Sequence, residues 1–261
     1  MATSPIMEMP ARSPEMADRR FHMAMALAMA FTIVAGFSLH LAMGRSSFAV
    51  PPIFHIHAFV SFAWIGLYLA QSILIAGNNA AWHRRLGMVA FGWVPLMVAV
   101  GLMLIVTVMQ RTGGPFFFDQ NQFLFSNPAH LLCFAGLTFA ALKVRRHAGW
   151  HRRLMLVGFA ILTGPGLGRL LPMPLAMPHA WHVNLAIVLI WPAIGMIRDR
   201  MVSGRIHPAW LRGIGTLLAS QVLADLVAYS DFGIAFTQQF VAGTPGADRP
   251  MEAFMPPGMA M

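Results

Sequence analysis

Seven apolar stretches constrain the fold of this chain more than any other feature of its sequence. A helical run of about 20 apolar residues can cross the hydrocarbon core of a bilayer, which is roughly 30 Å thick. We predict membrane spans at Phe21–Gly44, Ile53–Ala76, Leu86–Met109, Pro128–Lys143, Leu154–Leu171, Ala180–Ile197 and Trp210–Phe236. The predicted fold class is therefore all-α, a seven-transmembrane helix bundle over residues 21–240.

The charge distribution predicts both the partner and the orientation. A net charge of +9 would favour nucleic acid as a partner of a soluble chain, but 57% of the residues here are hydrophobic and the basic ones gather in alternate loops. We therefore expect the lipid bilayer, and not nucleic acid, as the partner. The positive-inside rule predicts a multi-pass protein of a bacterial inner membrane with a cytoplasmic N-terminus and an outer C-terminus. Residues 1–20 are predicted as a flexible cytoplasmic tail and residues 241–261 as a flexible outer tail.

An internal repeat suggests that the bundle is built from similar helical hairpins. The sequence Trp-His-Arg-Arg-Leu occurs at residues 82–86 and again at 150–154, each time where the chain turns back into the membrane. A weaker third copy runs from His182 to the segment 207–210. Such loops could bind phosphate or anionic headgroups, but interfacial Trp and topology-setting Arg explain them without a ligand. We therefore interpret these loops as segments that set the membrane topology and anchor the protein to lipid.

Histidines near the predicted outer face are the best candidates for a functional site. They are His40, His55, His57, His130, His179 and His182. Several of them lie within apolar runs, whereas the inner histidines lie in loops beside arginines. Residues two apart on a helix point to nearly opposite sides, so His55 and His57 cannot both face the interior. We expect His57, His130 and His182 to face the interior, with His40 next.

Two charged residues fall at the same predicted depth as these histidines. Arg169 lies in the outer half of the fifth span, just after a glycine-rich segment at 164–168 that we expect to break or kink the helix. Asp225 lies in the outer half of the seventh span. Charged side chains in a hydrocarbon layer are costly and usually face the protein interior. We therefore predict a pocket in the outer half, with a simple Arg169–Asp225 pair as the alternative.

This layer of histidines and charged residues best suits the binding of a b-type haem for electron transfer. A low-spin haem takes two imidazoles from facing helices at matching depth. We predict His57 and His130 as axial ligands, His182 or His40 as substitutes, and Arg169 at a propionate. A quinone or a periplasmic redox protein is the expected partner.

Two other classes of function stay open. Three histidines can hold zinc or iron with an open position for water, and His57, His130, His182 and Asp225 are the candidate ligands. The protein would then be a metal-dependent membrane hydrolase or oxygenase acting on a lipid-like substrate. The other class is a non-catalytic transporter or assembly factor. The catalytic residues, and whether the protein is an enzyme, are left undetermined by the sequence.

The segments His-Arg-Arg-Leu-Gly at 83–87 and His-Arg-Arg-Leu-Met at 151–155 resemble those of a group of uncharacterised bacterial integral membrane proteins. The spacing from the histidines at 55 and 57 to the first of these loops is similar too. The resemblance covers about residues 53–171 and implies the multi-pass topology. A looser similarity to b-type haem membrane cytochromes implies electron transfer.

Overall fold

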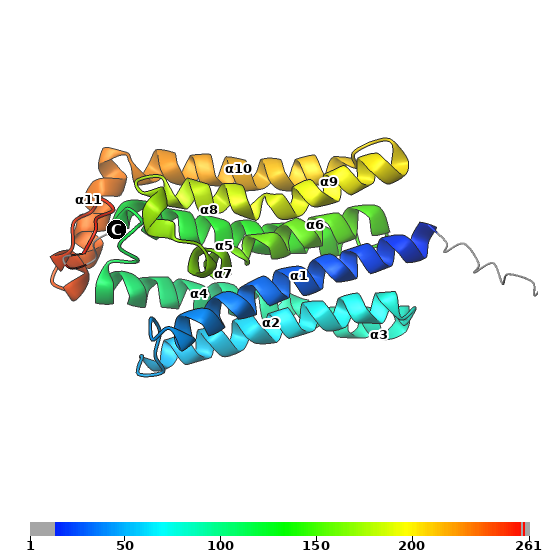
Figure 1. The fold of residues 1–261 in the computed structure, drawn as a ribbon, viewed down its shortest axis with the longest axis horizontal. Coiled ribbons are helices and arrows are strands. Elements are labelled where there is room, and N and C mark those ends of the chain that lie inside the picture. The colour runs from blue at the N-terminus through cyan, green and yellow to red at the C-terminus, as the bar shows by residue number, and fades with distance from the viewer. Residues whose placement is uncertain (1–13, 257, 259–261) are drawn as a thin grey trace, which may run out of the picture.

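The structure, a computed structural model, describes residues 14–256 and residue 258. Its helices are α1 (Pro14–Ala42), α2 (Pro52–Ala76), α3 (Ala80–Gly87), α4 (Ala90–Thr112), α5 (Gln120–Lys143), α6 (Ala148–Ile161), α7 (Gly164–Leu170), η1 (Met173–Ala176), α8 (Ala180–Val188), α9 (Ile190–Ser203), α10 (Pro208–Ala228), α11 (Asp231–Val241) and η2 (Pro245–Asp248). The long helices lie side by side in a bundle, and the described residues form no strand (Figure 1). The all-α fold class is confirmed.

Six helical segments in the described part of the chain are long and apolar enough to cross a membrane. They are Met16–Ala42, Pro52–Ala76, Ala90–Thr112, Gln120–Lys143, Ala180–Ser203 and Pro208–Ala228. The segment Ala180–Ser203 comprises α8 and α9. The predicted count of seven is therefore not confirmed. We call the bundle end that carries the loop between α4 and α5 the outer end, and the opposite end the inner end.

The predicted span Leu154–Leu171 differs most from the structure, because it consists of two short helices. α6 ends at Ile161 and α7 begins at Gly164, with Pro165 in the first turn of α7. Proline suits a first helical turn, but its missing N–H cannot continue the hydrogen bonds of a preceding helix. The Thr163 hydroxyl donates to the carbonyl of Ala160 at 2.6 Å within the break. The predicted break is thus present, but it lies just before the glycine-rich segment.

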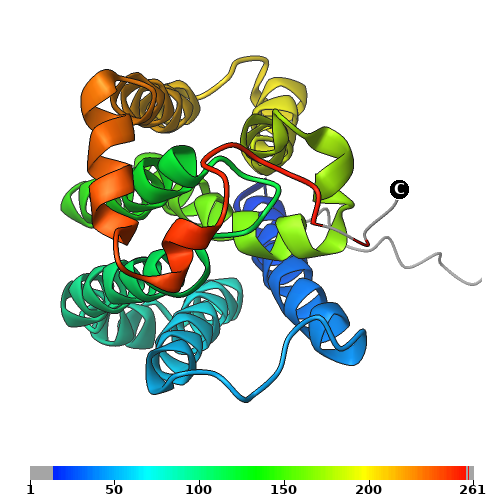
Figure 2. The same cartoon turned by 90° about the vertical axis from the view of Figure 1, so that its left-hand side faces the viewer.

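The last predicted span, Trp210–Phe236, also ends earlier than expected. α10 stops at Ala228, and the hydroxyl of Ser230 accepts a hydrogen bond from the Gly233 N–H at the start of α11. This capping contact begins a separate helix that lies across the outer end of the bundle (Figures 1 and 2).

Both predicted tails include helical residues, and residues 1–13 lie outside the described part of the chain. Residues 14–20 belong to α1. At the other end, the Arg249 guanidinium donates to four carbonyls of the loop between α4 and α5, those of Gly113, Gly114, Pro115 and Phe118. These contacts hold the C-terminal segment against the outer end (Figure 2). The predicted flexible tail at 241–261 thus includes a short helix, η2, and a residue with defined contacts, Arg249.

The bundle is built around α5, which packs against α4, α6 and α10. Phe134 on this helix is completely buried, and its ring meets that of Trp64 on α2 edge to face, with centroids 5.5 Å apart. By contrast, many large apolar side chains point outward, among them Phe31, Phe59 and Leu226. An apolar exterior of this kind suits a surface in contact with lipid.

Glycines let α1 and α7 approach each other closely. A Cβ atom on Gly36 would lie 2.3 Å from the Gly166 carbonyl oxygen, and one on Gly166 would lie 2.8 Å from the Cα of Ile33. Small residues allow this backbone contact between helices in membranes. The contact fixes α7, and with it Arg169, against the outer half of α1.

Candidate functional site

A contact between a histidine on α8 and an aspartate on α10 forms the centre of the candidate site. Nε2 of His182 lies 2.9 Å from Oδ2 of Asp225. The other carboxylate oxygen, Oδ1, accepts from Gln122 on α5 at 3.1 Å and from Gln221 on α10 at 2.9 Å. Three helices thus supply partners to one carboxylate. We call His182, Asp225, Gln122, Gln221 and Trp181 the outer polar cluster.

The amide of Gln221 is fixed in one orientation by its other contacts. Its oxygen accepts from the Trp181 indole N–H at 2.8 Å, and its nitrogen also donates to the Ser126 hydroxyl at 3.0 Å. Gln221 is almost completely buried, so this side chain cannot exchange its partners for water. The amide therefore presents an N–H group to Oδ1 of Asp225, while Oδ2 is contacted by His182.

The pair is open on one side. The side chain of His182 is 47% exposed and that of Asp225 is 24% exposed. A cavity of about 360 Å³ beside Asp225 is lined by Val222, Leu226, Tyr229 and Ser230 as well. Val222 and Leu226 are exposed apolar residues of α10, which is long and apolar enough to cross a membrane, so the cavity opens on an apolar face of the bundle.

His130 lies against the outer polar cluster. Its ring centroid is 5.5 Å from that of Trp181. Its Nε2 atom is buried and has no hydrogen-bond partner. Buried polar atoms in proteins normally have a hydrogen-bond partner, so this nitrogen is available to bind a ligand.

The other predicted residues form a separate group on α1, α2 and α7. Nε2 of His57 lies 3.3 Å from the Ser61 hydroxyl, and Arg169 is close enough to act electrostatically on both His57 and His40. The Arg169 guanidinium stacks over the ring of Phe37 at 4.1 Å. Arg169 and Asp225 therefore have different partners, and a simple pair between them is wrong.

The single predicted layer is thus divided into two groups. His182, Asp225 and His130 meet on one side of the bundle, while His40, His57 and Arg169 meet on the other. Between these two groups we find no hydrogen bond or ion pair in the described part of the chain. His55 and His179 are exposed. Of the predicted metal ligands, only His182 and Asp225 are in contact, and residues 14–256 contain no group of three or more His, Cys, Asp or Glu arranged to hold a metal ion.

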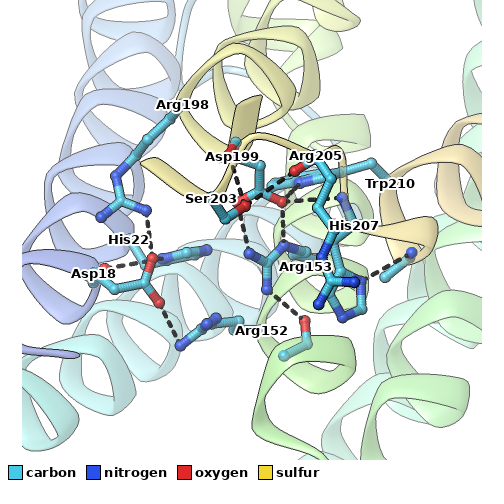
Figure 3. A network of polar contacts seen from close by, with 12 residues as sticks. Asp18, His22, Arg152, Arg153, Arg198, Asp199, Ser203, Arg205, His207 and Trp210 are labelled. Atoms are coloured by element: carbon cyan, nitrogen blue, oxygen red, sulfur yellow. Dashed lines mark hydrogen bonds and ion pairs between the residues drawn. The ribbon is translucent and has the colours of Figure 1, made fainter. Parts of the chain in front are cut away.

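A second polar network lies at the inner end (Figure 3). Arg153 on α6 binds Asp199 on α9 with two hydrogen bonds, Nε to Oδ2 at 2.8 Å and NH2 to Oδ1 at 2.6 Å. Oδ2 also accepts from the Trp210 indole N–H at 2.8 Å. Both charged side chains are buried, and this bidentate geometry is the strongest that the two groups can form.

A second aspartate joins three helices beside this pair. The carboxylate of Asp18 on α1 forms ion pairs with Arg152 on α6 and Arg198 on α9. Nδ1 of His22 lies 3.8 Å from the same carboxylate. We call Asp18, Arg152, Arg153, Arg198 and Asp199 the inner network.

Sequence reasoning missed the inner network for identifiable reasons. Asp18 falls in the predicted tail, and Asp199 lies two residues beyond the predicted end of the sixth span. The arginines were assigned to topology alone. The available signal was that Asp199 adjoins Arg198 in a chain with only nine acidic residues.

Comparisons of this chain with protein families, with curated proteins and with solved structures find no match. The resemblance to bacterial membrane proteins with repeated His-Arg-Arg-Leu loops therefore stays a prediction.

Proposed function

We propose that this integral membrane protein binds a lipid-soluble, hydrogen-bonding ligand at the outer polar cluster, and that His182, positioned by Asp225, takes up or releases a proton when the ligand binds. One observation carries the proposal. The two side chains are 2.9 Å apart on helices of an apolar bundle, and Asp225 lines a cavity beside the exposed apolar residues Val222 and Leu226. Ionisable pairs at membrane depth are costly to maintain and typically mark a ligand or proton pathway.

The chemistry of the pair suits proton exchange. An imidazole can accept or donate a proton near neutral pH, and a neighbouring carboxylate orients the ring and stabilises its charged form. The buried amide of Gln221 keeps the carboxylate in place while His182 remains accessible. His182 is the group we expect to exchange the proton, and Asp225 the group that positions it.

The cavity favours a particular class of ligand. Val222 and Leu226 offer an apolar wall, while Asp225 offers a charged acceptor. A ring with a hydroxyl or carbonyl oxygen and an apolar tail meets both requirements. We therefore propose a quinone or quinol, which agrees with the electron-transfer role predicted from the sequence.

Calorimetric titration of the purified protein in nanodiscs with decylubiquinone and decylubiquinol tests this function. Titrations in two buffers of different ionisation enthalpy report proton uptake or release. We expect saturable binding with proton exchange for the unmodified protein, and about tenfold weaker binding for His182→Ala and Asp225→Asn. The matched controls are His179→Ala and Asp231→Asn, whose side chains are exposed at the same end. Equal binding by all four variants, or none by the unmodified protein, would overturn the proposal.

Binding of b-type haem is a second candidate, and the unpartnered Nε2 atom of His130 favours it. Such a haem needs a second imidazole in reach of the same iron. The contacts of His57 are with Ser61 and Arg169, so His182 becomes the alternative second ligand to test. An absorption spectrum of protein expressed with excess haem decides the matter, because a missing Soret band excludes this function. His130→Ala should abolish the band and His83→Ala should not. Elemental analysis of the same sample tests zinc or iron.

A further inference from the structure

A cavity at the inner end is lined by the charged side chains of the inner network. Its volume is about 320 Å³, and Val202 and Ser203 of α9 complete its wall. Figure 3 shows that the side chains of Asp18, Arg152 and Arg198 converge from three different helices. The outer polar cluster lies at the opposite end of the bundle, so an inference from this cavity does not depend on the proposed function.

The charges around this cavity are not balanced. Arg153 is engaged by Asp199 and by the Gly149 carbonyl, which leaves Asp18 as the one carboxylate of the described residues that forms ion pairs with Arg152 and Arg198. One positive charge is therefore in excess. In addition, the Nε atom of Arg152 is buried without a hydrogen-bond partner. Excess positive charge, an unused donor and an adjoining cavity together favour an anionic ligand.

The comparison between the two copies of the repeated loop argues against topology as the full explanation. Arg84 and Arg85 of the first copy are exposed, as topology and lipid anchoring require. The residues at the same positions of the second copy, Arg152 and Arg153, turn toward the inner network instead. Topology alone gives no reason for a cavity with converging guanidinium groups.

We infer that this cavity binds a phosphate group through Arg152 and Arg198, and that Asp18 occupies part of the phosphate position when no ligand is bound. Guanidinium groups match the geometry of phosphate oxygens and bind them with paired hydrogen bonds. Basic pockets between membrane helices at the cytoplasmic side suit the headgroups of anionic lipids. The phosphate belongs either to such a headgroup or to a small soluble phosphate compound.

Two arms of one experiment distinguish these sources. In the first, thermal unfolding of the full chain in neutral detergent is followed while inorganic phosphate or glycerol 3-phosphate replaces chloride at constant ionic strength. In the second, native mass spectrometry measures how much phosphatidylglycerol and phosphatidylcholine the protein retains from an equal mixture. Saturable stabilisation in the first arm identifies a soluble phosphate, and selective retention of phosphatidylglycerol in the second identifies a lipid.

Variants separate a binding role from a merely structural one. Arg198→Gln and Arg152→Gln should weaken binding by about tenfold, the loss of one charge-assisted hydrogen bond. Arg84→Gln, at the matching position of the exposed copy, should bind like the unmodified protein. Asp18→Asn should bind about tenfold more tightly, because the competing carboxylate loses its charge.

The Asp18→Asn variant keeps the inference falsifiable even if the arginine variants fail to fold. A purely structural network predicts that this variant is less stable and gains nothing from phosphate or phosphatidylglycerol. That result, or no binding of either ligand class by the unmodified protein, would overturn the inference.

Discussion

His83 and His151 meet at the inner end, with ring centroids 6.2 Å apart and ring planes nearly perpendicular. Each Nδ1 atom is hydrogen-bonded to a carbonyl near the end of the preceding long helix, that of Gln71 at 3.3 Å and that of Ala141 at 2.9 Å. The two histidines hold the same position in the repeated Trp-His-Arg-Arg-Leu sequence. The repeat therefore reproduces a local structure, in which histidine ties the turn to the end of the incoming helix.

The third proposed copy of the repeat does not share this contact. Nδ1 of His207 accepts a hydrogen bond from the Ala209 N–H and caps α10. Its ring lies against Trp150, with centroids 5.2 Å apart. His207 thus belongs to the inner end, like the other two histidines, but it caps the helix that follows it.

Removal of these histidine contacts should destabilise the protein unequally. His151→Ala should lower the free energy of unfolding by about 1 kcal/mol, the typical net value of one hydrogen bond. His83→Ala should cost less, because its hydrogen bond is longer. Denaturation in mild detergent measures the difference. Equal effects of the two substitutions would show that the hydrogen bonds do not decide stability here.

Stability should also fall as the pH is lowered. Burial lowers the pKa of both His83 and His151, so the folded state binds fewer protons than the unfolded state. The contribution of these two histidines to the free energy of unfolding is fully present above the ordinary histidine pKa of about 6.5. This contribution is lost as the pH falls below that value. The melting temperature should drop between pH 7.5 and pH 5. The double variant His83→Ala/His151→Ala should show a shallower drop, and an unchanged slope would contradict this origin.

The buried pair Arg153–Asp199 should be strongly sensitive to the loss of one partner. Asp199→Asn leaves a buried guanidinium without a counter-charge, and breaking such a pair costs about 3–5 kcal/mol. Unfolding measurements should place the double variant Arg153→Met/Asp199→Leu above Asp199→Asn in stability. Arg85→Met is the control, since that arginine is exposed at the matching position of the first repeat.

The close approach of α1 and α7 should not tolerate a side chain. Gly36→Ala brings Cβ within 2.3 Å of a backbone oxygen and forces the helices apart, at about 1–3 kcal/mol. Gly66→Ala on α2 is the control, because nothing lies within 4 Å of its Cβ position. Melting temperatures of the two variants in the same detergent test the expectation. Equal stability would mean that α7 is not held by this contact.

The predicted orientation can be tested with single cysteines. Gln238→Cys on α11 should react with a membrane-impermeant maleimide in intact cells, whereas Arg205→Cys at the inner end should react only after permeabilisation. Both positions are exposed, and the native Cys133 is buried. The opposite labelling pattern would reverse the proposed topology.

The sequence predicted well how deep each polar side chain lies in the bundle. It predicted poorly toward which neighbouring helix each of these side chains points. Counting along a helix from its charged end places Asp225 and His182 at one level, and the structure brings them into contact. Whether His57 faces His130 depends instead on how the helices rotate and pack, which hydropathy does not encode. Helix ends were missed where one residue sets them, as Pro165 does at α7 and Ser230 does at α11.

The contacts of Arg249 have a consequence for how the protein is made and handled. This residue follows all six candidate spans of the described chain, yet it holds the loop that leads to Asp119, just before α5, and to Gln122 within α5. The outer end is therefore closed only after all six candidate spans have been made. A reporter or purification tag inserted next to Arg249 would disturb these contacts and with them the loop that leads into α5.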